Sequence, residues 1–127
     1  MGQLYRPYAF LGNSNGGSHN NYYIRFSPMC LKSFGEKNRA KIMKSADNAY
    51  IVIEPYTEYE PKREIWTRGI KYYGSAAFIY VTGFVNDGFF NAEWFGTGKK
   101  HKVKKDSKGR IYVCLNDVYE GKDADGE

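Results

Sequence analysis

The chain is poor in the residues that most often carry catalysis or bind metals. It has two histidines and two cysteines among its 127 residues. Neither cysteine belongs to a C-x-x-C pair, which argues against a structural zinc site. No Gly-x-Ser-x-Gly segment marks a hydrolase nucleophile. We therefore expect a protein that is not an enzyme and that uses no cofactor.

Long apolar segments are also missing. No run approaches the roughly 18 apolar residues that suggest a membrane span, and the opening MGQLYRPYAFLG lacks the apolar core of a signal peptide. Cys30 and Cys114 are too few for a disulfide framework, and their apolar neighbours favour buried free thiols. These features predict a cytoplasmic protein with no membrane partner.

Aromatic residues and positive charge are abundant instead. Phe, Trp and Tyr make up 17% of the chain, and the net charge is +5 with a pI of about 9.1. Residues 116–127 carry a net charge of −4, which leaves +9 on the rest of the chain. A body this basic attracts polyanions such as nucleic acid or an acidic protein face.

The composition divides the chain into a domain and a tail. One globular domain is expected over residues 1–115, followed by an acidic tail, residues 116–127, that we expect to fray. Within the domain, residues 12–21 (GNSNGGSHNN) contain turn-forming residues and no apolar side chain that would anchor them. This segment is therefore predicted to be a flexible loop.

Strand patterns dominate the domain. Residues 22–27 (YYIRFS) alternate as a half-buried strand does, and Ser27, Pro28 and Gly35 are placed to start and stop a short helix. Turn residues between apolar runs predict three hairpins, with strands over 39–45 and 49–55, 76–85 and 89–95, and 102–105 and 110–115. With a weaker strand over 63–68, the class is α+β and strand-rich: a curved antiparallel sheet or small barrel of about seven strands with one short helix.

The most prominent motif is the basic run from Lys99 to Arg110, KKHKVKKDSKGR. In a strand, Lys100, Lys102 and Lys104 would project from one face about 6.6–7 Å apart, a spacing suited to a row of phosphates. The candidate binding residues of the run are Lys99, Lys100, His101, Lys102, Lys104, Lys105, Lys108 and Arg110. The alternative is that the lysines protect an edge strand from pairing with another chain.

Paired aromatic residues extend this candidate site. In a strand, Tyr22 and Tyr23 face opposite ways, so one of the two rings can be exposed. An exposed ring beside a basic groove can stack a base. The alternative is that both rings pack, one on each face of a layered sheet.

Two resemblances follow from these patterns. Residues 22–55, with YYIRFSPMCLKSFG and AKIMKSADNAYIVIEP, resemble small phage and mobile-element proteins. Some of these have the swapped-hairpin fold of transition-state DNA-binding regulators. The overall type, small, charged and without catalytic motifs, also resembles anti-CRISPR proteins. These resemblances imply a bacterial host and, for the regulator version, a homodimer.

Three functions are compatible with this reading. We expect a non-enzymatic phage-type protein whose basic hairpin engages a nucleic acid or a protein–nucleic acid complex. This would be an anti-CRISPR-type inhibitor whose partner is a CRISPR effector nuclease. The first alternative is a DNA-binding transcriptional regulator. The second is a small metal-dependent nuclease, whose carboxylates would come from separate strands.

Overall fold

The computed structural model describes residues 7–16, 19–57 and 66–119 of the chain. These residues form nine strands of one antiparallel sheet, in the order β5-β3-β4-β9-β8-β1-β2-β7-β6. The strands are β1 (Tyr8–Gly16), β2 (His19–Phe26), β3 (Arg39–Lys44), β4 (Tyr50–Tyr56), β5 (Thr67–Gly69), β6 (Lys71–Tyr73), β7 (Ala76–Tyr80), β8 (Lys100–Lys105) and β9 (Ile111–Tyr119). The strand-rich α+β prediction is confirmed, with nine strands in place of about seven.

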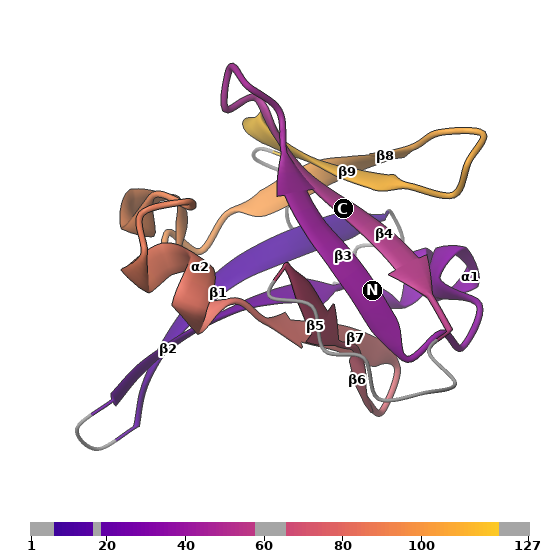
Figure 1. Ribbon diagram of the computed structural model, residues 1–127, viewed down its shortest axis with the longest axis horizontal. Coiled ribbons are helices and arrows are strands. Elements are labelled where there is room, and N and C mark those ends of the chain that lie inside the picture. Colours follow the sequence, from indigo (N-terminus) through magenta and orange to yellow (C-terminus); the bar gives the residue numbers. More distant parts are fainter. Residues whose placement is uncertain (1–6, 17–18, 58–65, 120–127) are drawn as a thin grey trace.

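The sheet curls until it is nearly closed. Strand β5 at one end of the sheet contacts β7 near the other end, and Figure 1 shows the strands wrapping around a common interior. Alternate side chains fill this interior, as the period of a strand requires. On β2, for example, Ile24 and Phe26 are fully buried, while Tyr23 and Arg25 lie on the outer face and are partly exposed.

The predicted short helix is present between β2 and β3. It begins as a 3-10 turn, η1 (Pro28–Cys30), and continues as α1 (Leu31–Phe34), which ends at Gly35 with a φ of 53°. Phe34 is fully buried and packs edge-on against Phe26, with ring centroids 4.9 Å apart. Ser27 lies at the N-cap position, but its Oγ accepts a hydrogen bond from the Tyr8 backbone and leaves the helix uncapped.

The two hairpins around the turns at 46–48 and 106–109 are confirmed as β3–β4 and β8–β9. The prediction for 76–95 is wrong in its second half. Strand β7 stops at Tyr80, and the chain then forms α2 (Thr82–Asn86) and the 3-10 helix η2 (Ala92–Trp94). Phe84 and Val85 of α2 are buried in the core, and Trp94 of η2 packs against the core and is partly buried. The Asp87 carboxylate accepts a hydrogen bond from the Phe89 backbone, and the Asp-Gly turn joins two helices.

The other differences between prediction and structure lie in polar segments and at strand ends. Residues 12–16 and 19–21 are paired in the β1–β2 hairpin, so the flexible-loop prediction is wrong there, and residues 17–18 lie outside the described residues. Strand β9 continues through Tyr119, past the predicted domain end at 115, while residues 120–127 lie outside the described part. Of the predicted strand 63–68, only Trp66 to Arg68 is described, and β5 begins at Thr67.

Gly12 lies in the polar part of β1 and has a close contact with β2. It lies opposite Tyr23 in the β1–β2 ladder, and a Cβ at position 12 would overlap the Tyr23 ring. The glycine therefore makes room for a ring that lies across the neighbouring strand, a use of glycine that requires no turn.

We expect Gly12→Ala to lower the free energy of unfolding by about 1–3 kcal/mol, the usual cost of overpacking. Urea unfolding followed by tryptophan fluorescence measures it. Asn13→Ala, at the exposed neighbour on the same strand, is the matched control and should change the value by no more than about 0.5 kcal/mol. Equal stability of Gly12→Ala and the wild type would show that the Tyr23 ring does not occupy this place.

Candidate nucleic-acid interface

Strand β8 lies inside the sheet, with β9 on one side and β1 on the other. The edge-strand interpretation is therefore wrong for Lys100–Lys102, where β8 lies between β1 and β9, whereas Val103–Lys105 pairs with β9 alone among the described residues. Lys100, Lys102 and Lys104 lie on the outer face of the sheet, and their side chains are partly or fully exposed. The lysines therefore need another explanation.

Each of these three lysines has its ammonium group over a tyrosine ring. Lys100 Nζ lies 5.4 Å from the centroid of Tyr8, Lys102 Nζ 5.5 Å from that of Tyr119, and Lys104 Nζ 5.7 Å from that of Tyr50. These distances fall within the range of cation–π attraction. Lys102 also forms an ion pair with Asp117, at 3.2 Å.

The other residues of the basic run differ in their exposure and in their contacts. Lys99, Lys105 and Lys108 are exposed. Arg110 is engaged, because its Nε donates to Asp106 Oδ2 at 2.7 Å. Desolvation acts to raise the pKa of Asp106, but hydrogen bonds from the backbone and guanidinium of Arg110, the Tyr112 hydroxyl and the Lys108 backbone lower it to about 2. Asp106 thus stays ionised and neutralises Arg110.

His101 is a correction to the predicted site, because it is buried and faces away from the lysines. A bulge lies between His101 and Val103, where the register of β9 shifts. His101 Nδ1 lies 2.9 Å from the Cys114 carbonyl oxygen in this irregular stretch, and its Nε2 has no partner among the described residues. A protonated Nδ1 would donate to that carbonyl, which makes the histidine a structural element of the bulge.

The tyrosine pair divides between the two faces of the sheet. Tyr22 packs on the core and meets Phe95 edge-on at 5.5 Å. Tyr23 lies on the outer face among Phe10, Phe78 and Tyr80, at centroid distances of 5.8 to 6.4 Å. Tyr23 therefore remains a candidate binding residue, whereas Tyr22 is a core residue.

Strand registers extend the surface well beyond the predicted hairpin. Residues directly opposite one another in an antiparallel sheet share a face. One such row crosses six strands and alternates aromatic and cationic side chains: Tyr119, Lys100, Phe10, Arg25, Phe78 and Lys71. We refer to these six residues as the cation–aromatic row; at the usual strand spacing its length is about 24 Å.

The members of the row interact with each other and with neighbouring rings. Arg25 Cζ lies 4.8 Å from the Phe10 centroid, and Lys71 Nζ lies 5.4 Å from that of Tyr80. None of the six side chains is buried. Sequence reasoning missed most of the row, although the alternation in YYIRFS had already placed Tyr23 and Arg25 on one face of their strand.

No protein-family model, curated protein or solved structure matches this chain. Within residues 7–16, 19–57 and 66–119, no helix is both long and apolar enough to cross a membrane. In the same residues, no group of three or more His, Cys, Asp or Glu side chains is placed to hold a metal ion.

Burial of His101 has a consequence for the pH dependence of stability. Desolvation lowers the pKa of His101 from its ordinary value of 6.5, the hydrogen bond to Cys114 opposes this, and Lys99 adds to the lowering. The unfolded chain therefore takes up a proton that the folded protein resists, and stability is lost as the pH falls below about 6.5.

We expect the free energy of unfolding to fall between pH 7.5 and pH 5.5, measured by urea unfolding at several pH values, and His101→Asn to flatten that slope. The asparagine amide retains a donor near Nδ1 but does not titrate. The control is His19→Asn, at the second histidine. If the slope persisted in His101→Asn and disappeared in His19→Asn, the pH dependence would come from His19, and the prediction for His101 would be contradicted.

Proposed function

We propose that this protein is a non-enzymatic binding protein that engages single-stranded nucleic acid, alone or within a nucleoprotein, through the cation–aromatic row. The observation that carries the proposal is the regular alternation of ring and cation across six strands. Single-strand binding combines cations that follow the backbone with rings that stack bases. The row places both kinds of group on one exposed face.

The chemistry of the row favours a single strand over a duplex. In a duplex the bases stack on one another, so only their edges are accessible from the grooves. In a single strand they can turn outward and stack on Phe10, Phe78 or the nearby Tyr23. Lysine and arginine would then contact phosphates, which fixes position without reading sequence. We therefore expect weak dependence on base sequence.

The test is fluorescence anisotropy with a labelled 15-nucleotide oligothymidine and a duplex of equal length. We expect the single strand to bind at least about tenfold more tightly than the duplex, because each stacked base contributes roughly 1–3 kcal/mol. With about four phosphate contacts, the log–log dependence of its affinity on salt concentration should have a slope of about −3.

Two double variants separate charge from stacking. Lys100→Gln with Arg25→Gln should reduce the salt slope, since two phosphate contacts are removed. Phe10→Leu with Phe78→Leu should weaken binding at least about fivefold and leave the slope unchanged. Lys32→Gln with Lys37→Gln, at two lysines on and just after α1, removes the same two charges away from the row and is the matched control. Equal weakening by this control would mean that only the net charge of the protein matters.

The inhibitor hypothesis remains a prediction, and a pulldown from a bacterial lysate distinguishes it from simple single-strand binding. An inhibitor of a CRISPR effector would ignore the free oligonucleotide and would retain a protein complex from a bacterial lysate after nuclease treatment. The regulator alternative predicts instead that the duplex binds more tightly. The nuclease alternative predicts cleavage that requires magnesium or manganese and stops with a chelator.

A further inference from the structure

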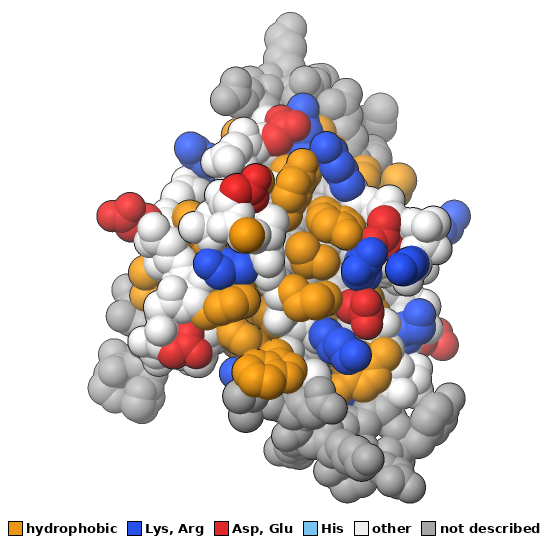
Figure 2. Space-filling model, turned by 45° about the horizontal axis from the view of Figure 1, so that its top comes forward, with side chains coloured by type: hydrophobic (Ala, Val, Ile, Leu, Met, Phe, Trp, Pro, Cys, Tyr) orange, Lys and Arg blue, Asp and Glu red, His pale blue; other side chains and the backbone are white. Residues whose placement is uncertain are grey.

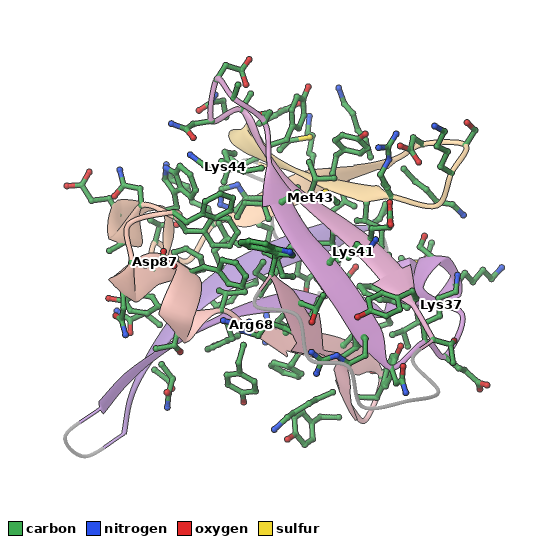
Figure 3. All side chains as sticks on the ribbon, in the orientation of Figure 1. Lys37, Lys41, Met43, Lys44, Arg68 and Asp87 are labelled. Carbon is green, nitrogen blue, oxygen red and sulfur yellow. The ribbon has the colours of Figure 1, made fainter. Side chains whose placement is uncertain are left out.

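A second candidate site lies apart from the cation–aromatic row, between strand β3 and helix α2. Strand β5 pairs with β3 only along Arg39–Lys41. Beyond that pairing the structure holds a cavity of about 620 Å³, with Met43 and Lys44 of β3 among its lining residues. Figure 3 shows Lys41, Met43 and Lys44 along β3, Arg68 near β5 and Asp87 beside α2. The volume falls within the range of small-molecule sites.

The cavity walls are largely aromatic and apolar. Trp66, Phe84 and Phe89 line it, and the Trp66 side chain is 57% exposed. Figure 2 shows hydrophobic side chains gathered in a band on one face of the molecule, with Lys and Arg side chains on both sides of it. Walls of this kind accept a planar apolar group by stacking and by removing apolar surface from water.

The charged groups at the cavity are unequal in sign. Among the lining residues that the structure describes, Lys41, Lys44 and Arg68 face one carboxylate, that of Asp87. Lys44 Nζ bonds to the neutral Asn48 Oδ1 at 2.7 Å, while Lys41 is 3.9 Å from Glu54, a residue outside the lining. The described part of the lining therefore has an excess of positive charge, which an anionic group would complement.

Aromatic rings hold two of these cations against the walls. Arg68 Cζ lies 4.4 Å from the Phe84 centroid, and Lys44 Nζ lies 5.1 Å from that of Phe89. Gly83 permits the approach of Arg68 to α2, because a Cβ there would lie 3.0 Å from Arg68 Nη2. Burial lowers the pKa of Arg68, the nearby Arg39 adds to this, and Asp87 opposes it. An anion beside Arg68 would favour its charged form.

We propose that this cavity binds a small molecule with a planar apolar body and one anionic group, the body against Trp66 and Phe89 and the anion between Lys44 and Arg68. Both a nucleoside monophosphate and an aromatic carboxylate have this chemistry. The proposal uses no residue of the cation–aromatic row, so each site can be tested without the other.

The test uses the dye 8-anilinonaphthalene-1-sulfonate, which combines a planar apolar body with an anion, and the uncharged N-phenyl-1-naphthylamine, which has a similar body. We expect the sulfonate to bind the full chain with one-to-one stoichiometry, and the uncharged compound to bind at least about fivefold more weakly. Equal affinities, or a dye signal that does not saturate, would overturn the proposal.

Substitutions locate the dye. Lys44→Met and Arg68→Met should each weaken binding of the sulfonate about three- to tenfold and leave the uncharged compound unchanged. Asp87→Asn should strengthen it about two- to threefold, while the asparagine oxygen can still accept from the Phe89 backbone. Lys105→Met, at an exposed lysine of β8, removes the same charge away from the cavity. If Arg68→Met fails to fold, the dye affinities of Lys44→Met and Asp87→Asn decide whether the sulfonate binds in this cavity.

Competition then identifies the source of the anion. Adenosine 5′-monophosphate and indole-3-acetate are added separately to the dye complex. Displacement by the first indicates a nucleotide site, and displacement by the second indicates an aromatic carboxylate site. Inorganic phosphate at the same concentration should displace little dye, since it lacks the apolar body. Displacement by neither organic anion, or equal displacement by phosphate, would contradict the proposal.

Discussion

The constraint on which this structure depends is the curling of one antiparallel sheet around its own core. Most strands give alternate side chains to the interior, which is filled mainly by Ile, Val, Leu, Phe and Ala. Many of the other aromatic residues lie on the outer face, for example Phe10, Tyr23 and Phe78. There the lysines and arginines lie over their rings, as Arg25 does over Phe10. The chain's two abundant residue classes are thus brought together by the geometry of a closed sheet.

Hairpins with clear turn residues could be predicted from the sequence. Strands formed by polar residues could not, because a polar segment has the composition of a loop. The β3–β4 and β8–β9 hairpins have apolar strands around clear turn residues, so local pattern and tertiary structure agree. Strand β1 continues into Gly12–Gly16, where no apolar residue marks it, and the missing side chain of Gly12 makes room for the Tyr23 ring opposite. The apolar run that continues from β7 into α2 was predicted to be one strand over 76–85, because short buried helices and strands have similar composition.

Much less of the candidate site was predictable. The outward direction of Lys100, Lys102 and Lys104 followed from strand alternation alone. The row that joins Tyr119 to Lys71 requires the registers of five strand pairs, which a single sequence does not contain. The role of His101 was equally hidden, since it depends on a bulge whose position is set by the pairing of β8 with β9.

The arrangement of cations over rings has a consequence for binding strength. In the free protein the three cations of the row, Lys100, Arg25 and Lys71, already lie over aromatic rings, and such a contact contributes about 0.5–1 kcal/mol at exposed sites. A base that stacks on Phe10 must displace Arg25 from that ring, and the guanidinium then becomes available for a phosphate. The stacking gain of roughly 1–3 kcal/mol is reduced by the contact that is given up. Under the proposed function, several nucleotides would have to bind together before the affinity becomes high. The length of the row, six strands, would then matter more than the strength of any one contact in it.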